Sequence, residues 1–548
     1  MGEDYIGQLV DKIWPHMDED GNASYRENQK EVVLDVLKAF YEDDFDNYVI
    51  SAPTGFGKSP VCFTVTQVGG MLEKYEGDLN ERAEHVLEEL MGHRYDESGF
   101  YVTPQNILLD QLKEDYGHLS TFGDLKGRSH YQCSEAQMKT CSEGPCRFDK
   151  QLECDRYGAQ KERAMDSAVF NTNFTMFMVH PDIEERPLLV TDEAHMMPEY
   201  VLSQVEVKLR EDELEDFDWE IPRFDDFGEY VDWMRPKAFD LQDRIQTLDA
   251  KVSMQDPVDA ELIYEYDNTR EMESKLSRLV HDWKENKEPW VVQHKEEYDE
   301  RKGQTVNVVN FRPVTPYRFM EGLVFGKGEK RLISSATPPS SDLLGLNSNN
   351  SCRLTLDSPF PVDNRPCFYD PIGKMSSSNR ADYTPEVVDK AIEESKGKTI
   401  LHAHTYQFAH QLKDEFYSRG MADDIITQES GNREQSLEKW KNSDARYFIS
   451  VNMYDGIDLK DDLCRTNIIC VVPFPYLGDP QVRKRKDEEG DKFFNWETAM
   501  KMQQAYGRST RSDTDWSDTF ILDSNFGWFF EQNSEYFFDW FAEAVEDV

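Results

Sequence analysis

A glycine-rich loop lies between an apolar strand pattern and an amphipathic helical pattern near the start of this chain. Residues 52–59 read Ala-Pro-Thr-Gly-Phe-Gly-Lys-Ser, after the apolar segment 48–50 and before the helical run 61–72. The two glycines let the backbone turn tightly and direct its N–H groups, together with the helix N-terminus, at phosphate oxygens. Because such a loop needs a strand before it and a helix after it, the segment predicts an α/β fold with a phosphate site.

Two side chains at the end of this loop have the chemistry needed to bind a nucleoside triphosphate. Lys58 can reach the β- and γ-phosphates, and Ser59 can place its hydroxyl on Mg²⁺. Position 52 is alanine where such loops usually carry their first glycine, so an ordinary glycine turn is the alternative interpretation. The residues predicted to contact the nucleotide are Pro53, Thr54, Gly55, Phe56, Gly57, Lys58 and Ser59.

Two adjacent carboxylates follow a second apolar run. Residues 187–190 read Pro-Leu-Leu-Val, short enough for a buried parallel strand, and Asp192 and Glu193 come soon after. Asp192 is placed to hold Mg²⁺, and Glu193 to orient or deprotonate the attacking water. A solvated acidic loop is the alternative in a chain with 107 Asp and Glu residues, but the strand end and the following Ala194-His195 argue against it. The two segments together predict an ATP-driven motor.

The acidic excess is spread along the whole chain. The formal net charge is −46 and the isoelectric point is about 4.6. A motor that binds nucleic acid ordinarily carries basic grooves, because phosphate neutralisation supplies most non-specific affinity. At about 1 M salt the Debye length falls to roughly 3 Å, so dispersed carboxylates then neither destabilise the fold badly nor repel DNA. We therefore expect a halophilic source, the alternative being an acidic protein with a basic partner.

Length, N-terminus and cysteine count indicate an intracellular protein of several domains. A chain of 548 residues suggests about three or four folding units. No signal-peptide pattern follows Met1 and no run of about 18 apolar residues occurs, so we expect a soluble, cytoplasmic protein without membrane contact. We also expect a monomer. Nine cysteines, an odd number, argue against a disulfide framework.

Four of the cysteines cluster in a polar segment. Cys133, Cys141, Cys146 and Cys154 are separated by seven, four and seven residues in a stretch rich in Gln, Glu, Lys and Gly-Pro. Too few apolar residues surround them to bury four unpaired thiols. Four thiolates can hold a tetrahedral zinc ion or a [4Fe–4S] cluster, and the spacing alone does not separate the two.

The segments that flank this cluster resemble those of a known family. Residues 126–133 read Lys-Gly-Arg-Ser-His-Tyr-Gln-Cys and 171–174 read Asn-Thr-Asn-Phe. They are similar to the segments that lead into and out of the cluster domain in superfamily 2 helicases of the XPD and DinG type. Those are iron–sulfur helicases that move on single-stranded DNA. The resemblance, and not the spacing, therefore favours a [4Fe–4S] cluster over zinc.

The resemblance assigns roles to further residues of the first half. Arg26 and Gln29 match the family's segment that recognises adenine, which implies a preference for ATP with Mg²⁺. Thr103 and Gln105 lie in a Tyr-Val-Thr-Pro-Gln segment that resembles the motif touching the DNA backbone. Thr337 ends a Ser-Ala-Thr triplet that, in the family, links the hydrolysis site to nucleic acid.

Two signatures of the same family follow in the second half. Asp458 lies in Tyr-Asp-Gly-Ile-Asp-Leu, which resembles the family's Glu-Gly-Ile-Asp motif and implies a contact with the nucleotide ribose or with the finger arginines. Residues 503–511 closely match Gln-x-x-Gly-Arg-x-x-Arg, and a helix would place Gln504, Arg508 and Arg511 on one face. When the lobes close, these arginines are expected to reach the γ-phosphate and stabilise the charge of the transition state.

The resemblance implies an α/β fold of two RecA-like parallel-sheet lobes, with an iron–sulfur cluster insertion and a helical Arch-like insertion in the first lobe. The Arch-like region is highly charged, and its tryptophans are more readily explained as a small core than as a base-stacking platform. The expected boundaries are 1–104, 176–203 and 311–340 for the first lobe, 105–175 for the cluster domain, 204–310 for the Arch-like insertion and 341–548 for the second lobe.

By resemblance, the enzyme hydrolyses ATP to move five-prime to three-prime on single-stranded DNA and to separate duplex at junctions, in DNA repair or replication, in a haloarchaeal or haloviral source. Catalysis would depend on Lys58, Ser59, Asp192, Glu193, Arg508 and Arg511. Two alternatives stay open: a DNA-stimulated ATPase that remodels protein–DNA complexes without unwinding, and a nucleotide-switched DNA-binding protein.

Overall fold

The computed structural model describes most of the chain. The described residues are 4–90, 98–136, 138–144, 154–254, 260–285, 290–299, 303–454, 459–507, 510, 512 and 514–546. They form two compact units, which we describe separately. The first unit comprises residues 1–200, 320–475 and 491–548, and the second comprises 201–319 and 476–490.

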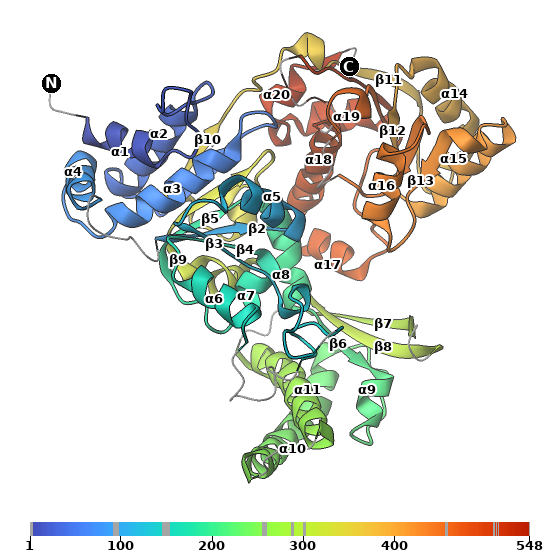
Figure 1. The fold of residues 1–548 in the computed structure, drawn as a ribbon. Coiled ribbons are helices and arrows are strands. Elements are labelled where there is room, and N and C mark those ends of the chain that lie inside the picture. The colour runs from blue at the N-terminus through green and yellow to red at the C-terminus, as the bar shows by residue number, and fades with distance from the viewer. Residues whose placement is uncertain are drawn as a thin grey trace. The chain divides into compact units, whose positions relative to one another are not determined.

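A parallel sheet organises the N-terminal half of the first unit (Figure 1). In spatial order its strands are β10 (Ser351–Thr355), β1 (Asn47–Ser51), β9 (Gly328–Ser335), β5 (Arg186–Thr191), β2 (Gly99–Thr103), β4 (Val169–Asn173) and β3 (Phe122–Leu125). The strands at the centre are buried on both faces, as their short apolar runs predict. Chain crossovers between parallel strands are helical, which gives the expected α/β layering.

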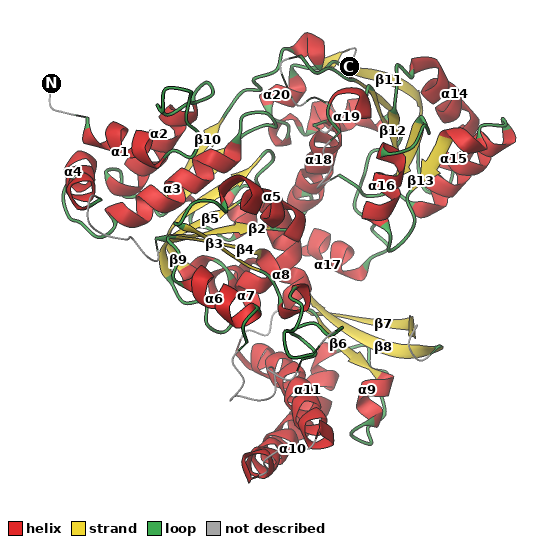
Figure 2. Cartoon of the chain, in the orientation of Figure 1, coloured by secondary structure: helices red, strands yellow, loops and turns green. Residues whose placement is uncertain are grey.

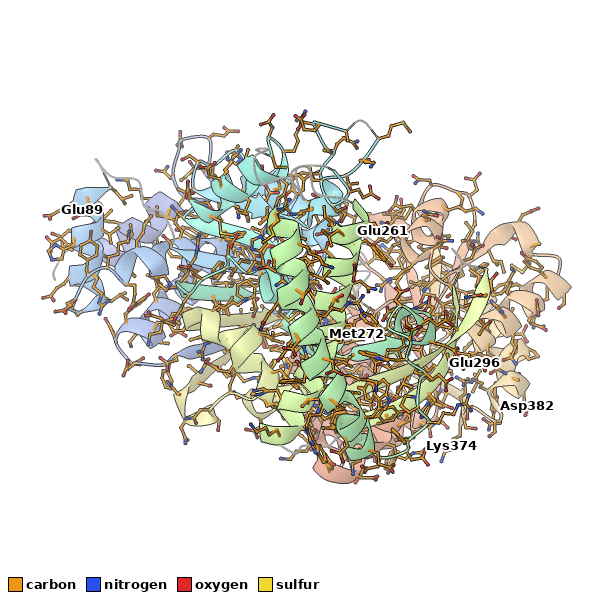
Figure 3. The ribbon with its side chains drawn as sticks, turned by 90° about the horizontal axis from the view of Figure 1, so that it is seen from below. Glu89, Glu261, Met272, Glu296, Lys374 and Asp382 are labelled. Carbon is orange, nitrogen blue, oxygen red and sulfur yellow. The ribbon has the colours of Figure 1, made fainter. Side chains whose placement is uncertain are left out.

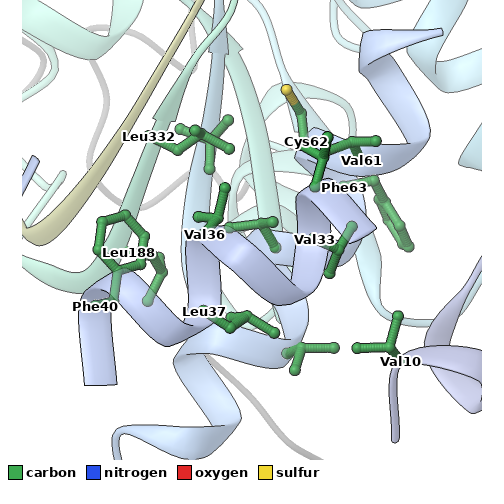
Figure 4. Close-up of a cluster of buried hydrophobic side chains, with 14 of the residues drawn as sticks. Val10, Val33, Val36, Leu37, Phe40, Val61, Cys62, Phe63, Leu188 and Leu332 are labelled. Atoms are coloured by element: carbon green, nitrogen blue, oxygen red, sulfur yellow. The ribbon is translucent and has the colours of Figure 1, made fainter. Parts of the chain in front are cut away.

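Helices cover this sheet and close its core. They are α1 (Tyr5–Ile13), α2 (Gln29–Tyr41), α3 (Lys58–Leu72), α4 (Leu79–Glu89), α5 (Asn106–Tyr116), α6 (Tyr157–Met165), α7 (Phe174–Val179), α8 (Met197–Val205), α12 (Tyr317–Leu323) and α13 (Ser341–Leu344). α3 is buried almost all round, with Val61, Phe63 and Val65 in one cluster with Val36 and Leu188. Figure 4 shows this cluster, in which apolar side chains of α2 and α3 lie against the strands.

Gly70 lets α3 approach the sheet closely. A Cβ added at Gly70 would overlap the backbone of Ser98, just before β2. We expect Gly70→Ala to destabilise the protein by about 1–3 kcal/mol, because backbone cannot yield as a flexible side chain can. Gly322→Ala in α12 is the control, since nothing lies within 4 Å of the added Cβ there. Equal urea midpoints for the two variants would contradict this packing argument.

A second parallel sheet organises the C-terminal half of the first unit. Its strands, in spatial order, are β13 (Ile425–Thr427), β14 (Tyr447–Ser450), β12 (Thr399–His402), β15 (Thr466–Ile469), β16 (Asp518–Asp523), β11 (Cys367–Gly373) and β17 (Val545–Glu546). Its helices are α14 (Thr384–Glu394), α15 (Tyr406–Ser418), α16 (Arg433–Lys441), α18 (Lys492–Tyr506), α19 (Asn525–Gln532) and α20 (Asp539–Ala542). Figure 2 shows the alternation of strands and helices in both halves. The two sheets are the two RecA-like lobes.

The aromatic C-terminal tail completes the core of the second lobe. Phe526, Phe529, Phe537 and Phe541 are buried in one cluster with residues of α18, including Ala505. The apolar face of this tail therefore packs on the second lobe.

The second unit combines a helix pair with an antiparallel sheet. Its elements are β6 (Val207–Arg210), α9 (Glu211–Glu215), α10 (Phe227–Met254), α11 (Ala260–Glu285), β7 (Trp290–Asp299), β8 (Gln304–Pro313) and α17 (Pro480–Glu489), with the strands in the order β6-β8-β7. Met272 on α11, labelled in Figure 3, is buried between the helices and the sheet with Trp290. Trp219, Trp233 and Trp283 pack half-buried against the same core. The tryptophans thus contribute to the core of this unit.

A helix from the second lobe's part of the chain is built into this unit. Arg485 of α17 is 2% exposed and donates to Glu489 over 2.9 Å and to the Tyr317 hydroxyl over 2.7 Å. Asp479, which caps α17, pairs with Arg312 over 2.8 Å. These polar contacts explain why residues 476–490 share a unit with residues 201–319.

The sheet pairings correct two of the expected boundaries. β10 pairs with β1, so the first lobe extends beyond residue 341, where we expected the second lobe to begin. β3 and β4 pair with each other, and β4 also pairs with β2, so both belong to the first sheet although they fall within 105–175. The cysteine-containing segment is therefore smaller than expected. In both cases a short strand pairs with a partner distant in sequence, which local patterns do not reveal.

Acidic side chains are exposed in all parts of the chain. Figure 3 labels Glu89, Glu261, Glu296 and Asp382, which lie in α4, in α11, in β7 and just before α14, and all four are exposed. Exposed acidic side chains therefore occur in both lobes and in the second unit, as their spread along the sequence predicts.

Candidate nucleotide-binding site

The glycine-rich loop joins a strand to a helix as expected. β1 ends at Ser51, and α3 begins at Lys58 with Gly57 at its N-cap. Gly55 and Gly57 have φ angles of 91° and 79°, a left-handed conformation that favours glycine. α3 therefore begins directly after a loop whose shape depends on these glycines. The backbone N–H groups at the N-terminus of such a helix can bind phosphate.

Lys58 and the two carboxylates lie together at this loop. Nζ of Lys58 is 3.2 Å from Oε1 of Glu193, and the backbone N–H of Glu193 donates to Oδ1 of Asp192 over 2.9 Å. The carboxylates follow β5, which is separated from β1 by β9 alone. Because parallel strands present their carboxyl ends at one edge of the sheet, the loop and the carboxylates meet there.

Burial and charge set the protonation of this cluster. Asp192 is 8% exposed, and burial raises its pKa to about 6, although Lys58 opposes the shift. Burial disfavours the charged ammonium of Lys58, but Glu193 and Asp192 outweigh it and raise the pKa of Lys58. A buried carboxylate is stabilised by a bound cation, so the oxygen donors of Asp192 and Ser59 fit the expected Mg²⁺.

The raised pKa of Asp192 predicts a pH dependence of stability without divalent ions. Its folded-state pKa of about 6 exceeds the ordinary 3.8, so the proton on Asp192 stabilises the fold below about pH 4 and this contribution is lost as the pH rises through 6. When the pH is raised from about 4 to about 7.5, the stability of Asp192→Asn relative to wild type should therefore increase, on the order of 1–3 kcal/mol. Chemical denaturation at both pH values measures it, and a pH-independent difference would contradict the shift.

Sequence reasoning missed one residue of this cluster. Tyr101 in β2 is fully buried, and its hydroxyl donates to Oδ2 of Asp192 over 3.3 Å. In the sequence it stands out only as the start of the segment that contains Thr103. The signal that could have identified it is chemical, because a buried tyrosine hydroxyl in a core strand requires a hydrogen-bond partner.

The two residues expected to recognise adenine contact the glycine-rich loop. Nε2 of Gln29 donates to the carbonyl oxygens of Phe56 and Gly57, each over 3.0 Å. Nη1 of Arg26 donates to the carbonyl of Gly55 over 2.7 Å. The backbone N–H of Arg26 donates to Oε1 of Gln29 over 2.8 Å. Both side chains therefore hold the loop, and their contact with adenine stays a prediction.

The residues expected to touch DNA differ in exposure. Thr103, at the end of β2, and Thr337 are buried, whereas Gln105 at the N-cap of α5 is half-buried. Of the three, Gln105 is thus the one whose side chain is open to a ligand in this structure. DNA contact at all three positions stays a prediction.

The Ser-Ala-Thr triplet connects the carboxylate motif to α18. Oγ of Ser335 lies 2.8 Å from Nδ1 of His195, in the Asp-Glu-Ala-His segment. The same oxygen accepts from the backbone N–H of Thr337 over 3.1 Å, and Oγ1 of Thr337 accepts from Nε2 of Gln504 over 2.7 Å. A continuous chain of hydrogen bonds therefore runs from the first lobe to α18 of the second.

Three of the clustered cysteines lie among the described residues. Sγ of Cys154 is 3.9 Å from Sγ of Cys141. Burial is the main cause that raises the pKa of Cys141, and the neighbouring thiols of Cys154 and Cys133 raise it further. Soft thiolates this close suit either zinc or an iron–sulfur cluster. Within the described ranges, no three His, Cys, Asp or Glu side chains form a group that could hold a metal ion, so the cluster stays a prediction.

Four predicted site residues, Cys146, Asp458, Arg508 and Arg511, lie outside the described residues. Gly507, which precedes Arg508, is near the glycine-rich loop, because a Cβ added to it would lie 3.9 Å from Oγ1 of Thr54. The roles of these four residues stay predictions.

Fold and site define a class: two RecA-like lobes with a glycine-rich phosphate loop in the first. Residues 388–544 match the family model of the helicase C-terminal domain. The probable ATP-dependent helicase YpvA of Bacillus subtilis (strain 168) is 23% identical over 202 residues, which span 35% of this chain and only 31% of YpvA.

Solved structures share the architecture over nearly the whole chain. Xpd4 of S. tokodaii has a TM-score of 0.53 at 16% identity, covering 95% of this chain and 99% of that one. An XPD helicase has a TM-score of 0.56 at 14% identity, covering 93% and 98%. At these identities the likeness shows the fold, and it confirms the expected pair of RecA-like lobes. Among the described helices, none is both long and apolar enough to span a bilayer.

Proposed function

We propose that this protein is an ATP-dependent helicase. The observation that carries the proposal is the assembly of Lys58, Asp192 and Glu193 beside a glycine-rich loop at the N-terminus of α3. The helicase C-terminal match of residues 388–544, the similarity to YpvA and the XPD-like fold support the same class.

The residues of the first lobe have separate tasks in ATP hydrolysis. Lys58 contacts the β- and γ-phosphates, and until a nucleotide arrives its charge is balanced by Glu193. Glu193 orients the attacking water and accepts its proton. Ser59 and Asp192 would hold Mg²⁺, which neutralises the charge that develops on the phosphate oxygens.

The second lobe completes the site and couples hydrolysis to movement. Arg508 and Arg511 follow α18 and would stabilise the transition-state charge, and Asp458 would contact the ribose or these arginines. Gln504, already hydrogen-bonded to Thr337, connects α18 to the Ser-Ala-Thr triplet. A change in the phosphate site can thereby alter the position of the second lobe.

The proposed substrate is single-stranded DNA, on which the enzyme moves five-prime to three-prime and opens duplex junctions during repair or replication. The motif resemblance and the XPD-like fold support this reading. A [4Fe–4S] cluster bound by Cys133, Cys141, Cys146 and Cys154 would stabilise the inserted segment that contains these cysteines. The exposed acidic surface supports a salt-rich cytoplasm as the working environment.

Strand displacement tests the proposal. Partial duplexes with a five-prime or a three-prime single-stranded tail are incubated with ATP in about 1 M KCl, where this surface is screened. We expect displacement of the five-prime-tailed duplex alone, and none when Glu193→Gln replaces the wild type. ATP turnover without displacement would favour the remodelling ATPase instead.

Metal analysis tests the cluster separately. Anaerobically purified protein should contain about four iron and four sulfide per chain. Zinc in place of iron would contradict the cluster while leaving the ATP site untouched.

A further inference from the structure

A buried tyrosine contacts Asp192, one of the two residues proposed to hold Mg²⁺. Tyr101 lies in the middle of β2, next to β5, with Tyr101 opposite Val190. Asp192 lies two residues beyond Val190, about 6.6 Å further along at the rise of a β-strand. A tyrosine side chain that leans along the strand covers this distance, so its hydroxyl arrives beside the carboxylate.

The two oxygens of Asp192 accept hydrogen bonds from different donors. The hydroxyl of Tyr101 donates to Oδ2 of Asp192 over 3.3 Å. Oδ1 of Asp192 accepts from the backbone N–H of Glu193 over 2.9 Å. Each oxygen of Asp192 thus has its own donor, which fixes the plane of the carboxylate.

We infer that Tyr101 is a positioning residue for the nucleotide's Mg²⁺, acting through Asp192. Oxygen donors held in place before the metal arrives bind it more tightly than donors that must reorient. The inference rests on the proposed ATP hydrolysis.

A structural explanation competes with this one. Any buried tyrosine needs a partner for its hydroxyl, and Asp192 could simply be that partner. The two readings differ in what Tyr101→Phe would do. Phenylalanine fills the same space in the core, so a merely structural hydroxyl would change stability and leave the metal dependence of nucleotide binding as it is.

Binding of a fluorescent ATP analogue separates the readings. Its affinity is measured with Mg²⁺ and with EDTA, for wild type, Tyr101→Phe and the control Tyr116→Phe. Tyr116 is buried in the same core cluster as Tyr101 and makes no hydrogen bond to the proposed Mg²⁺ residues. Thermal unfolding checks the fold of each variant.

In EDTA, the affinity of Tyr101→Phe for the analogue should stay within about twofold of that of wild type. The factor by which Mg²⁺ increases this affinity should be roughly tenfold smaller than in wild type, because loss of a residue that holds a metal ligand weakens metal binding by about this much. The Mg²⁺ concentration for half-maximal turnover should rise similarly. Tyr116→Phe should match wild type in both measurements.

An unchanged Mg²⁺ dependence in folded Tyr101→Phe would overturn the inference and leave the ATPase proposal standing. If wild type bound no nucleotide with or without Mg²⁺, the proposed function would fail first. The double variant Tyr101→Phe/Asp192→Asn gives a second check. Because Tyr101 acts through Asp192, the loss of Mg²⁺ dependence in the double variant should be smaller than the sum of the single losses, and a full sum would overturn the inference.

Discussion

Lys58→Ala is expected to reduce ATP turnover by at least about 10²–10³-fold, because it removes the cation that meets the charge developing on the transferred phosphoryl group. The change also removes the partner of Glu193, which lies 3.2 Å away, and leaves Asp192 buried beside a second carboxylate. Nucleotide affinity should fall as well. Steady-state phosphate release, with and without single-stranded DNA, measures the effect.

Two variants control this experiment. Lys38→Ala removes an exposed lysine of α2 and should leave turnover unchanged. Glu193→Gln should keep nucleotide binding and lose turnover, because an amide cannot accept the proton of the attacking water. Turnover of Lys58→Ala within a few-fold of wild type would remove Lys58 from the mechanism.

Arg365→Ala is expected to destabilise the second lobe by at least about 3 kcal/mol, because it leaves three buried oxygen acceptors without their donor. Arg365 is 5% exposed and donates to the carbonyl of Phe360 over 2.9 Å and to the Tyr506 hydroxyl over 3.1 Å. It also contacts the carbonyl of Trp540 and the carboxylate of Glu543. The guanidinium therefore connects the segment before β11 with α18 and α20.

Chemical denaturation of the full chain, followed by far-ultraviolet circular dichroism, measures this loss. Arg446→Ala is the matched control, since Arg446 is an exposed arginine of the same lobe, just before β14, and its removal should cost less than about 0.5 kcal/mol. Equal unfolding midpoints for Arg365→Ala and Arg446→Ala would show that the buried network contributes nothing.

The strand, loop and helix of the phosphate site could be predicted because their signals are local. An apolar run at 48–50 and a helical run at 61–72 became β1 and α3, and both glycines of the loop adopt left-handed angles. The position of the carboxylates after β5 could also be predicted, since a short apolar run indicates where the strand ends. Local pattern therefore predicted which residues meet at the edge of the sheet.

Features that depend on distant pairing could not be predicted. β10 joins the first sheet by pairing Ser351 with Asn47, and no nearby residue signals a partner that far away in sequence. α17 belongs with residues 201–319 through a buried arginine, although highly charged helices are usually solvated. The contact of Tyr101 with Asp192 depends on the register of β2 against β5, which only the folded sheet defines.

We propose that a triphosphate binds at Lys58, is hydrolysed with Glu193 and drives movement on a single strand. The decisive measurement is phosphate release by wild type and Glu193→Gln, in molar KCl with and without single-stranded DNA. We expect DNA-stimulated release by wild type alone. Absence of release by wild type, or equal release by Glu193→Gln, would show that this site does not drive the motor.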